Sequence, residues 1–231
     1  MTTHLVFDFF GTLVSYSTSR TEQGYERSFD LLRTAGSLLG YEEFLSLWSE
    51  ISAEFDESAE RSHREFSMLE LATTFMARAV GSVDKELSQE FAETYVSEWN
   101  KGVRYVDGVT ALLRRLEPHF TLSIITNTHD PNLVPRHLQR MVVAHLFEEI
   151  VTSVEFGIRK PAPEIFNHAL GLLGTSTENC VYVGDNYAAD FVGARSAGIR
   201  PLLIDPLDRA PIGREDRLQS IFELEQKLAC L

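Results

Sequence analysis

The sequence predicts an α/β fold in which a parallel sheet of five strands is interrupted, after its first strand, by an all-helical segment. From residue 103 onward, short apolar runs alternate with amphipathic stretches of helix length, which is typical of successive βαβ units. Residues 15–102 show helical spacing of apolar residues and contain no convincing strand. Polar residues suited to chemistry follow four of the five expected strands, where open α/β sheets bind their ligands.

Length and charge restrict the classes of function. The chain has 231 residues, enough for one domain of ordinary size and a smaller one. Its net charge of -13, from 34 acidic and 21 basic residues, disfavours nucleic acid and anionic membranes as partners, because phosphate groups are held by Lys and Arg. A small anionic substrate remains compatible with this charge, since it meets only the residues of its own pocket.

The cysteines and the first residues predict a cytoplasmic protein. Cys180 and Cys230 are too far apart in the sequence for a disulfide scaffold or a zinc motif, and reduced thiols are the default in the cytosol. No basic region followed by a long apolar stretch opens the chain, so no signal peptide is expected. No apolar run reaches the ~18 residues typical of a membrane span, so no membrane association is expected.

The first expected strand, residues 5–7, is an unbroken apolar run that suits a strand buried on both faces of a parallel sheet. Asp8 follows directly and places a carboxylate at the carboxyl end of that strand. Gly11 allows a sharp turn and a close approach of the backbone to a ligand. Thr12 adds a hydroxyl, and the amides of this loop could surround an anion.

The helical segment, residues 15–102, carries aromatic residues along its apolar faces. Phe91, Tyr95 and Trp99, for example, are spaced four residues apart and fall on one side of a helix. Glycines separate one periodic stretch from the next. We predict that these aromatic faces pack against one another as the core of a helical unit.

After residue 102, strands separated by helices are expected to form right-handed βαβ units, so that the carboxyl ends of the strands lie along one edge of the sheet. The expected strands are residues 122–125, 150–154, 181–183 and 201–204. The expected helices are residues 107–116, 131–145, 163–173 and 187–197, with a closing helix over 217–228.

Side chains in four loops at this edge could meet in one pocket. Two carboxylates and a lysine there predict a divalent cation and a phosphate-like anion, because Mg²⁺ takes oxygen ligands from one or two carboxylates and from substrate phosphate. The lysine would balance anionic charge. The side chains are Asp8, Thr12, Thr126, Asn127, Lys160, Asp185 and Asp190.

Four ordered motifs at these strand ends resemble those of the haloacid dehalogenase-like (HAD) hydrolase superfamily. They are Asp8-Phe9-Phe10-Gly11-Thr12-Leu13, Thr126-Asn127, Lys160-Pro161, and Gly184-Asp185-Asn186 followed by Asp190. The helical segment resembles the cap domain of the superfamily's first cap class (C1). The resemblance implies a Rossmann-like core of residues 1–14 and 103–231, a helical cap of residues 15–102, and an active site between them.

The resemblance also implies a role for each motif residue. Asp8 resembles the nucleophile that forms a covalent aspartyl intermediate, and Lys160 the cation beside it. Mg²⁺ would be held by Asp8, Asp185 and the backbone carbonyl of Phe10, while Asp190 would orient the lysine. Thr126 resembles the hydroxyl that binds the transferring group. Further contacts to substrate are expected from Asn127, Gly11, Thr12 and Arg20.

Phe10 departs from the pattern of the superfamily's phosphatases, which usually carry a second Asp two positions after the nucleophile. That Asp protonates the leaving alkoxide and then activates water, and such general acid–base catalysis is typically worth about 10²–10⁴-fold. Its absence favours leaving groups that need little protonation, such as halide or an acyl phosphate. The superfamily's 2-haloacid dehalogenases also lack this Asp and carry an aromatic Tyr there, so Phe10 favours a dehalogenase.

Asp185 favours the opposite interpretation. The dehalogenases use no metal and share a Ser-Ser-Asn stretch where this chain has Asp185-Asn186-Tyr187. An unpaired carboxylate beside Asp8 would repel a carboxylate substrate, and a cation between the two removes this repulsion. We therefore expect a Mg²⁺-dependent phosphatase acting on a small phosphorylated metabolite. A 2-haloacid dehalogenase and a low-turnover binding or regulatory module are the alternatives.

Overall fold

The computed structural model describes residues 2–17, 23–81 and 85–230. The chain divides into two compact units, each described by itself below. The core unit comprises Met1–Ser15 and Arg104–Leu231, and the helical unit comprises Tyr16–Val103. Two short strands at the boundary, β2 (Val14–Tyr16) and β3 (Val103–Tyr105), pair as a two-stranded sheet.

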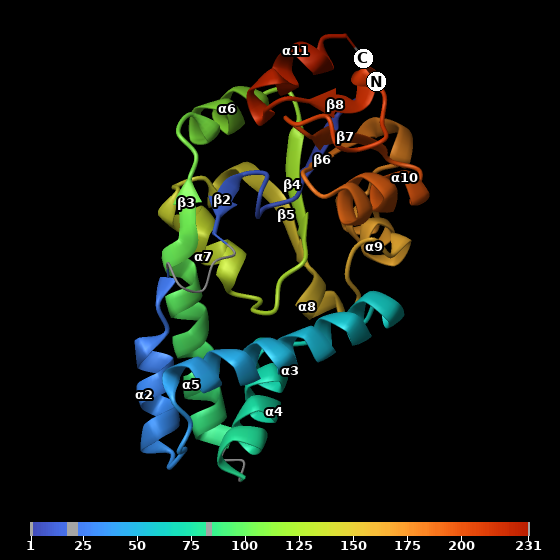
Figure 1. The fold of residues 1–231 in the computed structure, drawn as a ribbon. Helices are drawn as coiled ribbons and strands as arrows, with labels where there is room; N and C mark the ends of the chain where they lie inside the picture. The colour runs from blue at the N-terminus through green and yellow to red at the C-terminus, as the bar shows by residue number, and fades with distance from the viewer. Residues whose placement is uncertain (1, 18–22, 82–84, 231) are drawn as a thin grey trace. The chain divides into compact units, whose positions relative to one another are not determined.

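The core unit is built on a six-stranded sheet with the order β5-β4-β1-β6-β7-β8, in which every pair of neighbours is parallel (Figure 1). The central strands are runs of buried apolar residues, because helices cover both faces of the sheet. The strands are β1 (His4–Phe7), β4 (Thr121–Thr126), β5 (Phe147–Thr152), β6 (Cys180–Gly184), β7 (Arg200–Ile204) and β8 (Arg217–Leu218).

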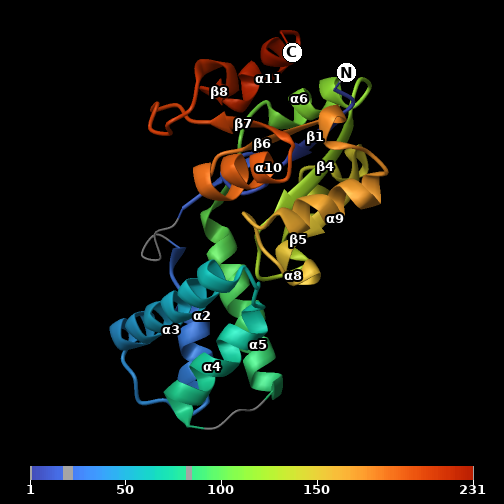
Figure 2. The same cartoon turned by 90° about the vertical axis from the view of Figure 1, so that its right-hand side faces the viewer.

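Figures 1 and 2 show α9 and α10 on one face of this sheet and α6 on the other. The apolar cluster on the α9 and α10 face includes Val6, Ile125, Phe166 and Tyr182. The helical segments are α6 (Val109–Leu116), α7 (Leu133–Arg140), η2 (Ala144–Leu146), α8 (Ser153–Phe156), α9 (Pro163–Leu173), η3 (Thr177–Asn179), η4 (Tyr187–Val192), α10 (Gly193–Ser196), η5 (Arg214–Asp216), η6 (Ile221–Glu223) and α11 (Leu224–Leu228).

The helical unit packs around aromatic side chains, which confirms the prediction made from their spacing. The rings of Trp48 and Tyr95 lie 4.1 Å apart between centroids, and those of Phe75 and Phe91 stack at 5.1 Å. None of the described helices is long and apolar enough to cross a membrane. The helices of this unit are α2 (Glu26–Thr34), α3 (Tyr41–Ser62), α4 (Met68–Val80), α5 (Lys85–Trp99) and η1 (Asn100–Gly102).

The sheet has six strands, so the expected count of five is one too few. The additional strand, β8, occupies the start of the expected closing helix, which is reduced to η6 and α11. Its position is fixed by pairing with β7 and by a hydrogen bond from the Asp205 amide to the Leu218 carbonyl at 2.9 Å. A strand of two residues is too short to show a periodic pattern in the sequence. The hydrogen bonds that hold β8 come from β7 and from Asp205, in another part of the chain.

Two expected helices also differ. The one over residues 131–145 is shorter, because the chain leaves α7 through Val142, whose φ of 56° ends the helical winding, and β5 then begins at Phe147. The one over residues 187–197 begins as a π-helix, η4, before α10.

Candidate active site

The loop after β1 brings Asp8 to the carboxyl end of the sheet. Asp8 is buried, and its amide donates a hydrogen bond to the Val183 carbonyl at 2.9 Å, which extends the pairing of β1 with β6. The chain then turns at Gly11, whose φ of 89° lies in the left-handed region that favours glycine. A Cβ atom at Gly11 would overlap the Asp185 carboxylate, so the loop packs directly against that group.

Lys160 connects three parts of the site through its ammonium group. Nζ donates hydrogen bonds to Asp8 Oδ1 at 2.7 Å, to Asp190 Oδ1 at 2.6 Å and to the Tyr182 hydroxyl at 2.7 Å. Burial by itself lowers the pKa of Lys160, but Asp190 and Asp8 outweigh burial and raise that pKa above its usual value. Lys160 is therefore a buried cation between two carboxylates.

Asn127 holds the backbone of Lys160. Its Nδ2 donates to the Lys160 carbonyl at 3.0 Å, and its Oδ1 accepts from the Lys160 amide at 2.9 Å. These bonds tie the loop after β4 to the loop that carries the lysine. Asn127 thus contacts the backbone of Lys160, and its contact with substrate stays a prediction.

Asp190 reaches Lys160 from η4, the π-helix that follows β6. Asp190 Oδ2 accepts from the Asn186 amide at 2.9 Å, and Asn186 Oδ1 caps the segment by accepting from the Ala189 amide at 2.9 Å. Gly184 leaves the necessary space, since a Cβ atom there would overlap the Asp190 carboxyl group. The π-helix thus holds a buried carboxylate against the lysine, in keeping with the frequent occurrence of π-helical turns at functional sites.

Asp8, Asp185 and Asp190 form an acidic cluster in which one oxygen of each lies within 4.8 Å of the others. Asp185 is the exposed member, and Thr12 Oγ1 donates a hydrogen bond to its Oδ1 at 3.3 Å. Burial raises the pKa of Asp8 to about 6, although Lys160 opposes the change. Desolvation by nearby protein atoms, then the charges of Asp8 and Asp190, raise the pKa of Asp185 to about 7, although the residue as a whole is exposed.

This cluster fits a hard divalent cation. Its donors are carboxylate oxygens, the ligand type that Mg²⁺ prefers. Burial, together with the charges of neighbouring carboxylates, raises the pKa of both Asp8 and Asp185. A nearby cation would favour the charged form of both groups.

Thr126 ends β4, the strand that neighbours β1. Its side chain is buried, and its Oγ1 atom has no hydrogen-bond partner among the described residues. A buried hydroxyl without a partner is unfavourable, so this atom is suited to a ligand that supplies one. Arg20, another residue expected to contact substrate, lies outside the described residues.

Phe10 belongs to an aromatic cluster beside the β1 loop. Its ring meets Phe9 edge-on, with centroids 5.0 Å apart, and meets His137 edge-on at 6.2 Å. His137 Nδ1 lies within hydrogen-bond distance of the Tyr105 hydroxyl, 3.0 Å away. Burial, then Arg140, lowers the pKa of His137 to about 4, so its ring is neutral near pH 7. Phe10 therefore contributes an apolar ring and no titratable group at this position.

Tyr182 is a site residue that the sequence-based reasoning missed. Its hydroxyl contacts Lys160 and lies 3.0 Å from Asp190 Oδ1. Burial, then the charges of Asp190 and Asp8, raises the pKa of Tyr182 well above its usual value, so the hydroxyl is protonated. The available signal was a tyrosine inside an otherwise apolar strand, because a buried hydroxyl needs a partner.

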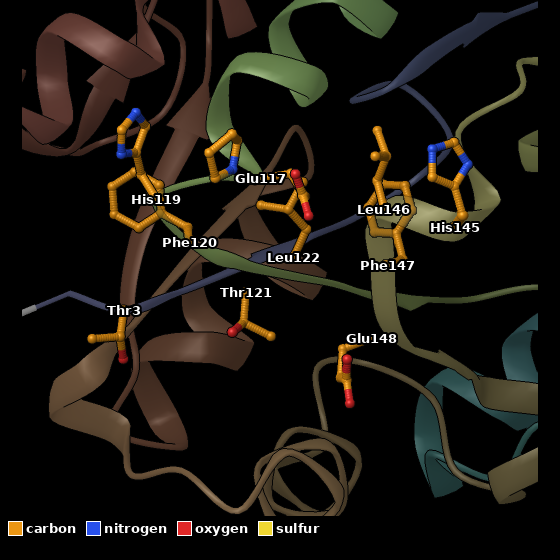
Figure 3. Close-up of a pocket in the computed structure, with 11 residues that line it drawn as sticks. Thr3, Glu117, His119, Phe120, Thr121, Leu122, His145, Leu146, Phe147 and Glu148 are labelled. Carbon is orange, nitrogen blue, oxygen red and sulfur yellow. The ribbon is translucent and has the colours of Figure 1, made fainter.

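A cavity of about 420 Å³ lies at the opposite edge of the sheet (Figure 3). Thr3, Thr121 and Phe147, at the amino ends of β1, β4 and β5, line this cavity. His119 and Glu148 add polar side chains to the lining. The site residues follow the carboxyl ends of the strands. This cavity is therefore separate from the candidate active site.

Residues 41–204 match the family model of the haloacid dehalogenase-like hydrolases. This range includes Thr126, Lys160, Asp185 and Asp190, and it begins after Asp8. A phosphoserine phosphatase of Thermus thermophilus is 33% identical over 120 residues, which are 52% of this chain and 48% of that protein. A glyceraldehyde 3-phosphate phosphatase of Methanopyrus kandleri is 35% identical over 98 residues, 41% of this chain and 40% of the relative.

Among solved structures, a 2-haloacid dehalogenase from Pseudomonas syringae pv. tomato is similar over 100% of this chain and 99% of its own. The TM-score is 0.73 and the sequence identity is 25%. The chain spans about half the length, or less, of the two curated phosphatases. The comparisons thus include hydrolases that act on phosphate esters and a hydrolase that acts on haloacids.

Proposed function

Because the chain belongs to the haloacid dehalogenase-like hydrolases, we propose that it is a Mg²⁺-dependent phosphatase that hydrolyses a small phosphorylated metabolite through Asp8. The observation that carries this proposal is the buried network of Asp8, Lys160 and Asp190, with Asp185 completing the acidic cluster. The names of the two phosphatase relatives support the same class of substrate.

In the proposed reaction, a carboxylate oxygen of Asp8 attacks the phosphorus atom, the bond from phosphorus to the leaving oxygen breaks, and an aspartyl phosphate forms. Water then attacks this phosphorus, releasing inorganic phosphate and restoring the Asp8 carboxylate. Lys160, bonded to Asp8 Oδ1, orients the carboxylate and balances the charge that gathers around it. The unpartnered hydroxyl of Thr126 would donate to an oxygen of the phosphoryl group.

Asp8, Asp185 and the backbone carbonyl of Phe10 would hold Mg²⁺. When bound, the metal neutralises charge on the phosphoryl group. The charges of the side chains explain why a metal would be needed. Three carboxylates and one lysine leave the ionised cluster net negative, and this charge opposes the approach of an anionic substrate.

This site differs from the family's usual phosphatases in having no acidic side chain at Phe10 to protonate the leaving group. The aromatic ring of Phe10 supplies no proton to the departing oxygen. Substrates whose leaving group is already acidic, such as acyl phosphates, therefore lose less rate than alkyl phosphates, whose leaving oxygen depends most on protonation. We expect acyl phosphates to be the better substrates.

A 2-haloacid dehalogenase is the second candidate. Phe10 and the full-length similarity to the Pseudomonas dehalogenase favour it. In that reaction Asp8 would attack carbon, halide would leave, and water would hydrolyse the resulting ester. The carboxylate of Asp185 stands against it, because a carboxylate substrate would be repelled by the cluster. A binding module with little turnover, the third candidate, has no need of the Asp8–Lys160 pair.

A substrate panel separates these candidates. Alkyl phosphates, acyl phosphates and 2-haloacids are each tested with Mg²⁺ and with excess chelator, and the release of phosphate or halide is measured. We expect phosphate release that requires Mg²⁺. Halide release that persists in chelator would establish the dehalogenase, and no turnover with any compound would favour the binding module.

Asp8→Asn tests the nucleophile in the same assay. Asn is close in shape and can still accept the Lys160 hydrogen bond, and Asp190 remains beside the lysine, so the variant should fold, with rates measured well below its melting temperature. The rate should fall at least about 10³-fold, because loss of a covalent catalyst costs far more than loss of a binding contact. The control is Asp30→Asn, at an exposed aspartate of α2. Retention of more than about a tenth of the rate in Asp8→Asn would contradict the mechanism.

A further inference from the structure

Tyr182 lies in the middle of β6, opposite Val6 of β1 in the parallel register. Its ring is buried in the apolar cluster beneath α9, where Phe166 meets it edge-on with centroids 5.2 Å apart. A phenylalanine would fill this space equally well. The ring therefore explains the packing, and only the hydroxyl requires a further explanation.

The hydroxyl oxygen lies at the end of the site network. It is 2.7 Å from Lys160 Nζ, 3.0 Å from Asp190 Oδ1 and 3.0 Å from the carbonyl oxygen of Ile125. Since an ammonium group only donates, the tyrosine oxygen accepts from Lys160. Its own proton then points to Ile125 or Asp190. The hydroxyl thus links the lysine to the backbone of β4, one residue before Thr126.

The three hydrogen bonds of Lys160 account for all the donors of its ammonium group. One goes to Asp8, one to Asp190 and the third to Tyr182. Without the third acceptor, a buried charged N–H would lack a partner, which is strongly unfavourable. The ammonium group would then rotate or shift to find one, at the expense of its bonds to the carboxylates.

We propose that Tyr182 is a positioning residue, whose hydroxyl holds the Lys160 ammonium group in the orientation that places N–H groups on both Asp8 and Asp190. This inference rests on the proposed function, in which Asp8 is the nucleophile. Tyr182 acts through the lysine, and no contact with substrate is required of it. The Ile125 carbonyl lies 3.0 Å from the hydroxyl oxygen, so a hydrogen bond to it joins the hydroxyl to the sheet itself.

Tyr182→Phe tests the proposal, because it removes one oxygen atom and keeps the ring. With the best substrate of the panel, we expect kcat to fall about 10-fold or more, since a misplacement of about 1 Å can cost about 10²-fold. KM should stay within about twofold, because binding of the substrate does not use the hydroxyl. All rates are measured well below the melting temperature of every variant.

Phe166→Leu is the matched control. It disturbs the packing of the same tyrosine ring from its apolar side and leaves the hydroxyl in place. We expect a lower melting temperature and an unchanged kcat. A kcat in Tyr182→Phe equal to that of the wild type would overturn the proposal. So would a fall in kcat of the same size in Phe166→Leu, since the effect would then come from packing.

A second measurement does not depend on turnover. The ¹⁵N NMR signal of the Lys160 ammonium group, assigned with Lys160→Arg, reports its hydrogen bonding and its exchange with water. We expect a changed chemical shift and faster hydrogen exchange in Tyr182→Phe, and no change in Phe166→Leu. An unchanged ammonium signal in Tyr182→Phe would overturn the proposal even if no substrate were found. Absence of turnover with an altered signal would instead count against the proposed function alone.

Discussion

Lys160 shows how closely a single buried charge depends on its partners. A lysine that is 3% exposed is unfavourable unless its donors are satisfied, and here two carboxylates and one hydroxyl satisfy them. Removing one partner of such a group typically costs about 3–5 kcal/mol, because the remaining charge is left uncompensated. The site residues are therefore coupled, and a substitution at one of them changes the others.

Phe10 permits a direct test of the missing proton donor. Phe10→Asp would place a carboxyl two residues after Asp8, and the neighbouring carboxylates should raise its pKa toward the range of a general acid. We expect kcat/KM for alkyl phosphates to rise relative to acyl phosphates by about 10-fold or more. The ratio is measured within each variant, which cancels differences in active fraction.

Phe10→Asn is the control for that experiment, because it introduces a polar side chain of the same shape without a titratable proton. It should leave the ratio of alkyl to acyl phosphate hydrolysis close to that of the wild type. A ratio unchanged in folded, Mg²⁺-binding Phe10→Asp would mean that protonation comes from another group, or that phosphate esters are not the substrates.

Asp185 and Asp8 predict proton release on Mg²⁺ binding. In the metal-free site their pKa values are raised to about 7 and about 6, so at pH 6 Asp185 is mostly protonated and Asp8 partly so. A bound cation favours the charged forms, so binding expels protons and the affinity rises as the pH increases from 6 to 8. Calorimetric titration at pH 6 in two buffers of different ionisation enthalpy measures the released protons.

Asp185→Asn supplies the comparison for this titration. This substitution removes the negative charge of one proposed ligand, so the affinity for Mg²⁺ should fall. It also removes the carboxyl group with the higher pKa, so fewer protons should be released on binding. A heat of binding that is the same in both buffers at pH 6 would contradict the prediction. Mg²⁺ affinity unchanged in Asp185→Asn would remove Asp185 from the proposed ligand set.

Among the elements, the loop after β1 and the π-helix η4 are built around close approaches. Gly11 packs against Asp185, and Gly184 packs against Asp190, so each loop leaves room for a carboxylate by having no side chain. Asn186 caps η4 through the Ala189 amide, which holds the segment in its winding. The positions of the carboxylates are thus set by backbone geometry as much as by the acidic residues themselves.

Gly11→Ala should separate backbone strain from disturbance of the site. The left-handed φ of 89° costs a non-glycine residue about 1–2 kcal/mol, and the added Cβ would also displace the Asp185 carboxylate. We expect a lower melting temperature together with weaker Mg²⁺ binding by calorimetry. Gly36→Ala is the matched control, because Gly36 has a φ of 93° with nothing within 4 Å of the added atom. Gly36→Ala should lose stability and keep its metal affinity. Equal Mg²⁺ affinities in the two variants would contradict the proposal that Asp185, beside Gly11, binds the metal.

At the scale of the whole molecule, each of the two units has a buried apolar cluster of its own. The core unit buries Ile165 beneath its sheet, and the helical unit buries Ile51 among its aromatic rings. Both tryptophans, Trp48 and Trp99, belong to the helical unit. Tryptophan fluorescence therefore reports unfolding of the helical unit, whereas far-UV circular dichroism reports both units.

Ile165→Ala and Ile51→Ala form a matched pair that tests the independence of the cores. Each removes the same atoms from a fully buried position, at a cost of about 2–5 kcal/mol to its own unit. In guanidinium unfolding, Ile165→Ala should shift the circular dichroism transition more than the fluorescence transition. Ile51→Ala should shift the fluorescence transition at least as much as the circular dichroism transition. Coincident transitions in both variants would show that the two units unfold as one.

The sequence by itself determined the class of fold and the candidates for the site. Buried strands appear as short apolar runs and amphipathic helices as a period of 3.6 residues, and both signals are local. Since parallel strands bring their carboxyl ends to one edge, placing Asp8, Lys160 and Asp185 after strands was enough to predict that they lie near one another. Their catalytic roles stay predictions until the variants above are measured.

Only the tertiary structure decided the sixth strand, the π-helix and the hydrogen-bond partners of two polar residues. Tyr182 bonds to a lysine 22 positions away, and Asn127 bonds to the backbone of a residue 33 positions away. The two residues of β8 are a strand only because β7 offers them a partner. Each of these features depends on hydrogen bonds between segments distant in the sequence, and such bonds leave no local pattern of residues from which they could be predicted.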